Sequence, residues 1–164
     1  MAESLTIADG LSKAEQYRSL LPQIEALIMG EDDLVANLSN VSAALKETFD
    51  FWWVGFYIVK KNELVLGPFQ GPVACSRIQI GKGVCGKVAQ KQQVLVVPNV
   101  EEFPGHIACS AASKSEIVVP LFNEDANLVG VLDVDSDQLN YFDDADQNGL
   151  ESLAKILSKL NWDE

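Results

Sequence analysis

The feature that most constrains the fold is a change of hydrophobic period near residue 50. Between Leu34 and Phe49, apolar residues recur every three or four positions, which predicts an amphipathic helix. Residues 52–59 are instead aromatic and β-branched, which predicts a strand. The switch therefore predicts a domain that packs helices against a sheet.

Capping and turn residues extend this pattern in both directions. Residues 12–15 form a capping-box sequence, which predicts a helix to about residue 21 that resumes after Pro22 and ends near Gly30. The second helix is expected to begin near Asp33. Its apolar face is opposed by polar side chains, namely Asn37, Asn40 and Lys46. Further strands are predicted at 63–66, 76–80, 94–97, 117–122 and 128–134, with helices within 81–90 and over 143–160.

This order of elements predicts an α+β fold, in which an antiparallel sheet has helices packed on one face. At 164 residues the chain is expected to form one domain. We place that domain at residues 12–160, with tails at 1–11 and 161–164. The segment 99–114 has no clear period, and loops of this length are often functional.

Composition and charge exclude two classes of binding partner, nucleic acids and membranes. The formal net charge is −12, and such an acidic surface repels phosphate backbones, so nucleic acid is not an expected partner. The first residues show neither a basic region nor a long apolar run, and no stretch reaches the roughly 20 apolar residues that span a bilayer. We therefore expect no membrane partner and a cytoplasmic location, where thiols stay reduced.

Three cysteines lie within 35 residues, each beside glycine or small residues: Cys75, Cys85 and Cys109. In a reducing compartment, structural disulfides explain them poorly. Together with His106 they offer a Cys3His metal set, but structural zinc sites usually show closely spaced cysteine pairs, which are absent here. We therefore expect no metal and favour redox chemistry, which needs an attacking thiolate and a resolving thiol.

Six motifs occur in one order: W-V-G-F-Y (53–57), L-V-L-G-P-F-Q-G (64–71), G-K-G-V-C-G (81–86), G-H-I-A-C-S (105–110), S-E-I-V-V-P (115–120) and G-V-L-D-V-D-S (130–136). Together they resemble the free methionine-(R)-sulfoxide reductases, a family of single GAF domains. The resemblance covers residues 12–160 and implies that fold and that activity.

The resemblance also implies residue roles. Cys109 is expected to be the nucleophile, Cys75 the resolving thiol and Cys85 the third cysteine, so that oxidation gives a Cys75–Cys109 disulfide. Acidic residues are expected to hold the free amino acid, with an aromatic pair helping to form the pocket. These binding residues are Glu116, Asp133, Asp135, Trp53 and Tyr57.

The residues themselves agree in part with these roles. Free methionine sulfoxide carries an ammonium, and Asp133 and Asp135 share one face of an otherwise apolar strand, where a cation would compensate their burial. A solvated strand end that caps the next turn is an equal alternative from spacing alone. Without the resemblance, Trp53, Phe56 and Tyr57 would be interpreted as core, with Phe56 on the opposite face.

Two further features have simple explanations. His106 lies three residues before Cys109 and is a candidate to lower the pKa of that thiol, but a loop histidine bonded to backbone is favoured. The turn at 81–83 lacks the P-loop pattern, so we interpret it as a tight turn that brings Cys85 toward the other loops.

The expected reaction is thiolate attack on the sulfoxide sulfur, with protonation of the departing oxygen by a carboxylic acid of raised pKa. A sulfenic acid then condenses to a disulfide, which an external dithiol, thioredoxin supplied by NADPH, reduces. No bound cofactor is expected, and a homodimer stays open. The alternatives are a GAF module that binds a small molecule without catalysis, or a thiol redox sensor.

Overall fold

The computed structural model describes residues 4–109 and 111–163, and its core is a six-stranded antiparallel sheet in the order β3-β2-β1-β6-β5-β4. The strands are β1 (Trp53–Lys60), β2 (Glu63–Gln70), β3 (Arg77–Gln79), β4 (Leu95–Val97), β5 (Ser115–Phe122) and β6 (Leu128–Ser136). The helices are α1 (Lys13–Ile28), α2 (Leu34–Phe49), α3 (Gly83–Lys91) and α4 (Asp144–Leu157), with a 3-10 turn at Val100–Glu102. The predicted α+β class is confirmed.

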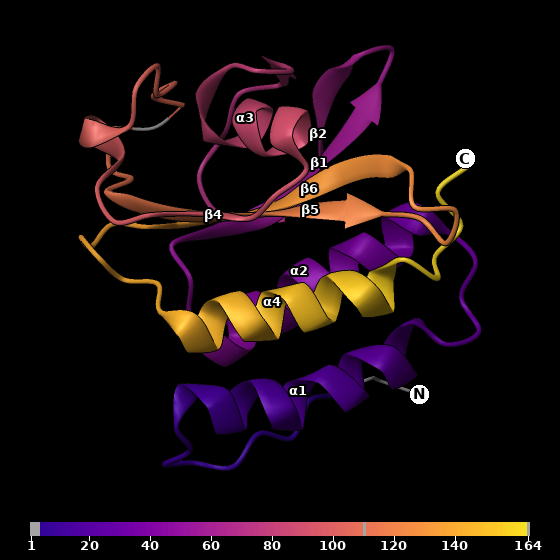
Figure 1. The fold of residues 1–164 in the computed structure, drawn as a ribbon. Helices are drawn as coiled ribbons and strands as arrows, with labels where there is room; N and C mark the ends of the chain where they lie inside the picture. The colour runs from indigo at the N-terminus through magenta and orange to yellow at the C-terminus, as the bar shows by residue number, and fades with distance from the viewer. Residues whose placement is uncertain (1–3, 110, 164) are drawn as a thin grey trace.

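The elements form layers (Figure 1). Helices α2 and α4 cover one face of the sheet, and α1 packs beneath them as an outer layer. The short helix α3 and the long loops lie on the opposite face. The prediction of helices on one face therefore holds for the three long helices, and α3 adds a second, smaller layer. This layer encloses the candidate site, because α3 contacts β3, β5 and β6.

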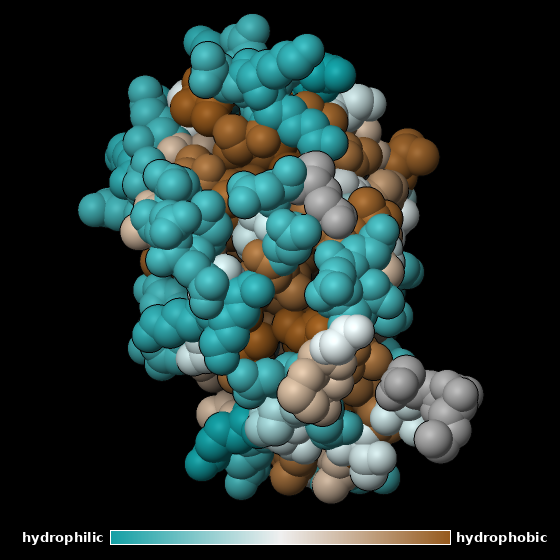
Figure 2. Space-filling view, turned by 90° about the vertical axis from the view of Figure 1, so that its right-hand side faces the viewer, coloured by the Kyte–Doolittle hydropathy of each residue, from teal (hydrophilic) through white to brown (hydrophobic). Residues whose placement is uncertain are grey.

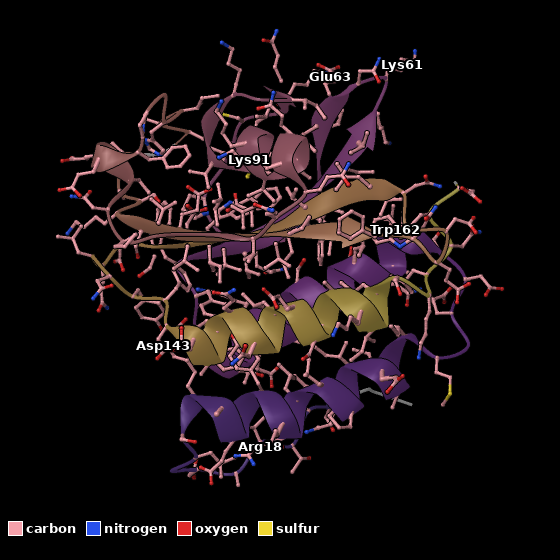
Figure 3. All side chains as sticks on the ribbon, viewed as in Figure 1. Arg18, Lys61, Glu63, Lys91, Asp143 and Trp162 are labelled. Atoms are coloured by element: carbon pink, nitrogen blue, oxygen red, sulfur yellow. A yellow bond between two sulfur atoms is a disulfide. The ribbon has the colours of Figure 1, made fainter. Side chains whose placement is uncertain are left out.

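Each face of the sheet carries its own apolar cluster, and strand alternation divides β1 between them. Phe56 packs toward α1, α2 and α4, whereas Trp53 and Tyr57 pack toward α3, as the alternation predicted. Figure 3 shows side chains filling the space between the sheet and the long helices. On the right-hand side of the molecule, polar side chains cover most of the surface and apolar ones show in the gaps (Figure 2).

Two details of the helices differ from the prediction. Helix α1 continues through Pro22 instead of breaking there. Proline has no N–H, so the carbonyl of Arg18, four residues earlier, lacks its helical hydrogen bond. Arg18 is exposed and points away from α4, so water can replace that bond (Figure 3). Asn37 was expected on the polar face but is buried. Its burial is possible because its side-chain amide donates to the Glu31 carbonyl at 2.8 Å.

The segments predicted as tails also pack on the domain where they are described. Leu5 and Ile7 lie against the main core, and so does Trp162, whose indole N–H donates to the Leu157 carbonyl at the end of α4. Residues 1–3 and 164 lie outside the described part. Within that part, no helix has the length and apolar character needed to cross a bilayer.

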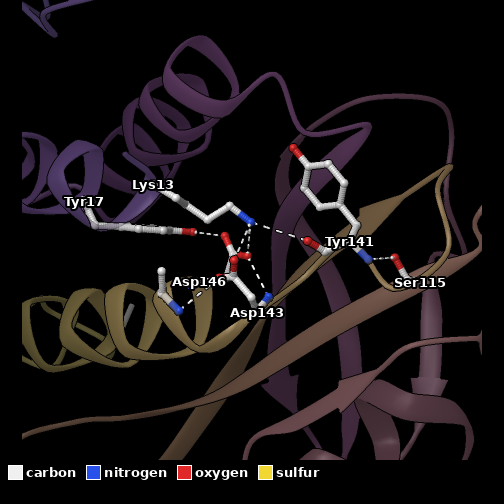
Figure 4. A network of polar contacts seen from close by, with 7 residues as sticks. Lys13, Tyr17, Ser115, Tyr141, Asp143 and Asp146 are labelled. Carbon is white, nitrogen blue, oxygen red and sulfur yellow. Dashed lines mark hydrogen bonds and ion pairs between the residues drawn. The ribbon is translucent and has the colours of Figure 1, made fainter. Parts of the chain in front are cut away.

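A buried carboxylate fastens α1 to α4 (Figure 4). Asp146 is fully buried and accepts a hydrogen bond from the Tyr17 hydroxyl at 2.8 Å and one from the Lys13 ammonium at 2.6 Å. Its second oxygen also accepts from the backbone N–H of Asp143, which closes a capping box at the start of α4. The carboxylate thus satisfies donors from both helices at one point.

Asp146→Ala is expected to lower the free energy of unfolding by about 3 kcal/mol, because it leaves the buried Tyr17 hydroxyl without its acceptor and removes the shorter of the two ion pairs of Lys13. Chemical denaturation of the wild type and the variant measures the difference. Asp144→Ala, in the same helical turn but exposed, is the matched control and should change stability by less than about 0.5 kcal/mol. Equal losses in both variants would contradict the role given to Asp146.

Candidate active site

The candidate site is a cavity of about 50 Å³ on the face of the sheet that carries α3. Strands β1, β5 and β6 supply its floor, and α3 supplies one wall. The segment before β3 and the loop before β5 supply the rest. Its lining residues include all the predicted binding residues together with Cys85 and Cys109.

A disulfide between Cys75 and Cys109 closes one side of the cavity. Their Cα atoms are 5.4 Å apart, within the range that a disulfide spans. The bond joins the segment before β3 to the loop before β5, and both cysteines are half-buried. The Tyr57 hydroxyl donates to the Cys75 carbonyl at 2.9 Å, which ties this segment to β1. The pairing implied by the family resemblance is therefore present.

Three carboxyl groups meet on the cavity floor because of strand register. Glu116 on β5 lies directly opposite Asp135 on β6, and Asp133 lies two residues further along the same face of β6. Glu116 and Asp133 are each 6% exposed, while Asp135 is half-buried. The alternative of a solvated strand end is therefore wrong for Asp133. Sequence spacing predicted the aspartate pair, but only the register brings Glu116 to it.

The hydrogen bonds of these carboxyl groups are incomplete. The Cys85 thiol donates weakly to Glu116 Oε1 at a sulfur–oxygen distance of 3.8 Å, and the Ser113 hydroxyl donates to Asp135 Oδ1 at 2.9 Å. Asp133 Oδ1 is buried and has no hydrogen-bond partner among the described residues. A buried carboxylate oxygen without a donor is costly, so the cavity is suited to a ligand that brings one.

Aromatic side chains form the wall beside the carboxyl groups. Trp53 and Tyr57 are almost fully buried, and Trp53 stacks on Phe69 at 5.2 Å between ring centroids. The Trp53 indole N–H donates to the Pro72 carbonyl at 3.0 Å, which fixes the ring. Trp53 and Tyr57 line the cavity as predicted, and Trp52 lines it as well, although no pattern in the sequence singled it out.

Comparison with known proteins identifies the fold family, because the GAF-domain profile matches residues 33–159. The chain belongs to the GAF-domain family. It is 61% identical to GAF domain-containing protein A of Dictyostelium discoideum, over 96% of this chain and 99% of that protein. It is 46% identical to the free methionine-R-sulfoxide reductase of Escherichia coli, over 92% of this chain and 91% of that protein.

A solved structure gives the same result. The X-ray structure of free methionine-R-sulfoxide reductase from Neisseria meningitidis in complex with its substrate superimposes with a TM-score of 0.92 at 51% identity. The match covers 96% of this chain and 94% of that one. The resemblance inferred from the six motifs is confirmed.

Burial shifts the acidities in this GAF domain. It raises the pKa of Asp133 to about 6. Burial first, and then the charges of the neighbouring aspartates, raise the pKa of Glu116 well above its usual range. The pKa of the Asp135 carboxyl and that of the Cys85 thiol are also raised, chiefly by burial. Burial therefore favours the protonated form of the Glu116 and Asp135 carboxyl groups in this site.

Asp133→Asn is expected to raise the free energy of unfolding at neutral pH by about 2 kcal/mol. Burial makes the ionised form of Asp133 unfavourable in the folded protein, and asparagine cannot ionise. Because the folded pKa of Asp133 is raised, its stabilising contribution is present below the unfolded value near 4 and is lost as pH rises through about 6. The gain in thermal stability of the variant should therefore be larger at about pH 7.5 than at about pH 5.

Thermal denaturation at the two pH values measures this gain. Asp137→Asn, at an exposed position just beyond β6, is the control for the loss of one negative charge. A variant no more stable than the wild type at the higher pH would contradict a raised pKa of Asp133 in the folded protein.

The turn before α3 is a tight glycine turn, as predicted. Gly81 and Gly83 have φ values of 88° and 60°, which favour glycine, and the Gly81 N–H donates to the Gly86 carbonyl at 2.8 Å. Helix α3 begins without a side-chain cap, and the cavity is lined by its N-cap residue, Lys82, and by residues 83–85 of its first turn. The turn delivers Cys85 to the carboxyl groups rather than forming a phosphate cradle.

His106 lines the cavity, and burial lowers the pKa of its imidazole. Its backbone N–H donates to the Phe103 carbonyl, and among the described residues its ring makes no hydrogen bond to Cys109. The disulfide occupies two members of the Cys3His set, so that set is not assembled here. Cys85, Glu116 and Asp133 are instead the donors that lie within 4.8 Å of one another.

Proposed function

We propose that this GAF domain reduces free methionine-(R)-sulfoxide to methionine, with Cys109 as the nucleophile. The proposal rests mainly on one observation. Cys109, which can form a disulfide, lies at a cavity whose floor holds buried carboxyl groups, and one of these has an oxygen without a hydrogen-bond partner among the described residues. A thiol beside an anionic pocket suits a small cationic substrate that is reduced by a cysteine. The relatives that carry the name of this reductase support the same assignment.

The cavity offers a place for each part of the amino acid. The substrate ammonium would donate to Asp133 Oδ1, with Glu116 and Asp135 beside it. The substrate carboxylate would face the uncapped first turn of α3, where backbone N–H groups and the helix dipole favour an anion. The S-methyl group would lie against Trp53 and Tyr57.

The chemistry follows from this placement. The Cys109 thiolate attacks the sulfoxide sulfur while a carboxylic acid protonates the sulfoxide oxygen. Glu116 is the proposed donor, because burial and neighbouring charges keep it protonated. The oxygen passes to Cys109 as a sulfenic acid, so the substrate sulfur gains two electrons, the cysteine sulfur loses two, and methionine leaves. Cys85 stays a neutral thiol that supports Glu116.

Recycling uses the second cysteine. The Cys75 thiol condenses with the Cys109 sulfenic acid, which releases water and forms the disulfide. An external dithiol, for which we propose thioredoxin, exchanges with this half-buried disulfide and restores both thiols. A cytoplasmic location agrees with a reductase that is recycled in this way. The homodimer stays a prediction.

The test is oxidation of NADPH by thioredoxin reductase and thioredoxin, coupled to the protein and free methionine-(R)-sulfoxide. The proposal expects stoichiometric methionine and NADP⁺. A thiol redox sensor would form the same disulfide with peroxide but would release no methionine, and a non-catalytic GAF module would bind without NADPH loss. Either of those outcomes would contradict the proposal.

Blocking the substrate ammonium is expected to lower kcat/KM by roughly 100-fold or more, because an acetyl group leaves the buried carboxyl groups without a cation. Free and N-acetylated methionine-(R)-sulfoxide, assayed side by side, measure the effect. The free S epimer is the matched control for stereochemistry and should also react slowly. Equal rates for the free and the acetylated substrate would remove the binding role of Glu116, Asp133 and Asp135.

A further inference from the structure

Three different elements bring a thiol and two carboxyl groups together on the cavity floor. Cys85 comes from α3, Glu116 from β5 and Asp133 from β6. All three are buried, and one donor atom from each lies within 4.8 Å of the others. Because two neighbouring strands and a packed helix fix the three donors, their spacing does not depend on a mobile loop.

The cluster also has an unsatisfied oxygen. Asp133 is 94% buried, and its Oδ1 atom has no hydrogen-bond partner among the described residues. The cavity lined by the same three residues has a volume of about 50 Å³, more than a single water needs. An unpartnered anionic oxygen beside such a space indicates a cationic ligand.

The donor set selects among cations. One sulfur and two carboxylate oxygens suit Zn²⁺, which takes four nitrogen, oxygen or sulfur ligands and often completes three protein ligands with a water molecule. Sulfur and oxygen ligands of a tetrahedral zinc lie about 3.6 Å apart, from bond lengths of about 2.3 and 2.1 Å. Cys85 Sγ and Glu116 Oε1 are 3.8 Å apart. Calcium and magnesium need more oxygen ligands than this pocket supplies and do not favour thiolates.

We propose that Cys85, Glu116 and Asp133 form a site for Zn²⁺ or a similar borderline-soft divalent cation. Binding releases the protons held by the thiol and the carboxyl groups, and the dication compensates the negative charge that remains. The site exists with the Cys75–Cys109 disulfide in place, because neither of those sulfurs belongs to it.

The consequence for activity rests on the proposed function. The metal would occupy the position assigned to the substrate ammonium, next to Asp133 Oδ1. Zinc and the amino acid therefore exclude one another, and the metal is a competitive inhibitor. The same burial that suits the carboxyl groups to an ammonium also suits them to a dication when a thiol is within reach.

Direct metal binding tests the site without any assay of activity. Protein in the disulfide form, with one free thiol verified by thiol titration, is titrated with Co²⁺ as a spectroscopic substitute and then with Zn²⁺. The expected result is one equivalent of Co²⁺ with a thiolate-to-cobalt charge-transfer band, which Zn²⁺ removes. The absence of such a band, together with no zinc-induced rise in melting temperature, would overturn the proposal.

Variants locate the site. Cys85→Ser should lose the charge-transfer band, and Glu116→Gln should weaken binding by roughly tenfold or more. Asp135→Asn is the matched control, since this neighbour does not belong to the donor set, and it should keep the band. A band that persists in Cys85→Ser would place the metal elsewhere. If Cys85→Ser does not fold, Glu116→Gln still decides, because an unchanged affinity there would contradict the proposed ligands.

Competition separates this inference from the proposed function. Free L-methionine, the reaction product, should raise the apparent dissociation constant for Zn²⁺ in proportion to its concentration, once the free Zn²⁺ is corrected for chelation by the amino acid itself. Free glycine, which chelates Zn²⁺ through the same amine and carboxylate, is the control for that correction. A protein that reduces free methionine sulfoxide but binds no Zn²⁺ would overturn the metal site and leave the enzyme assignment intact. Zinc binding that methionine does not affect would support the metal site but contradict the overlap with the ammonium position.

Discussion

Cys109→Ser is expected to abolish the reduction of free methionine-(R)-sulfoxide, with activity lowered by more than roughly 1000-fold even when a strong chemical dithiol replaces thioredoxin. A serine hydroxyl is scarcely ionised at neutral pH and cannot accept the sulfoxide oxygen as a thiolate does. Methionine release, measured by chromatography, tests the prediction. Near-normal turnover would contradict the assignment of the nucleophile.

The structure distinguishes Cys109 from the other cavity cysteine. Cys109 is half-buried and lies at the wall of the cavity, where a substrate can reach it. Cys85 is 4% exposed, and burial with nearby carboxylates raises the pKa of its thiol well above the usual value. A thiol that stays protonated is a poor nucleophile. Cys85→Ser should therefore retain far more activity than Cys109→Ser and serves as its control.

Much of the fold was predictable because it depends on local patterns. The period of the apolar residues located the helices and strands, and alternation along β1 placed Trp53 and Phe56 on opposite faces. Patterns of this kind do not report which side of the sheet a short amphipathic helix covers. The place of α3 depends on how the glycine turn at 81–83 directs the chain, which is a tertiary property.

The candidate site was predictable to the extent that its residues share a strand or a recognisable motif. Asp133 and Asp135 were placed on one face from their spacing, whereas Glu116 meets them only through the register of β5 and β6. The family resemblance supplied the Cys75–Cys109 pairing, which spacing alone left open. Ser113, which donates to Asp135, could not be found, because a loop serine is common and has no period.

Burial of polar groups was the least predictable feature. Asn37 was expected on a polar helix face, yet a hydrogen bond to the Glu31 carbonyl lets it face the interior. The acidities of the site depend on the same property, since burial raises the pKa of Asp133 to about 6. Neither result follows from sequence position, because both depend on how the surrounding elements exclude water.

Cys75→Ser separates the two halves of the catalytic cycle. The variant should release about one equivalent of methionine per protein in the absence of reductant, because Cys109 can still attack the substrate. Its turnover with thioredoxin should fall at least roughly tenfold, since thioredoxin exchanges with a disulfide and the variant presents a sulfenic acid instead. Wild-type protein under the same single-turnover conditions is the control for the first equivalent.

Peptide mapping decides which cysteine resolves the sulfenic acid. After one equivalent of substrate, wild-type protein should contain the Cys75–Cys109 disulfide, whose Cα atoms lie 5.4 Å apart in the structure, with Cys85 recovered as a free thiol. Cys85 is a poor substitute, because its thiol is buried and directed toward Glu116. In Cys75→Ser, the sulfenic acid should therefore persist long enough to be trapped by dimedone. A dominant Cys85–Cys109 bridge in the wild type, with Cys75 free, would transfer the resolving role to Cys85.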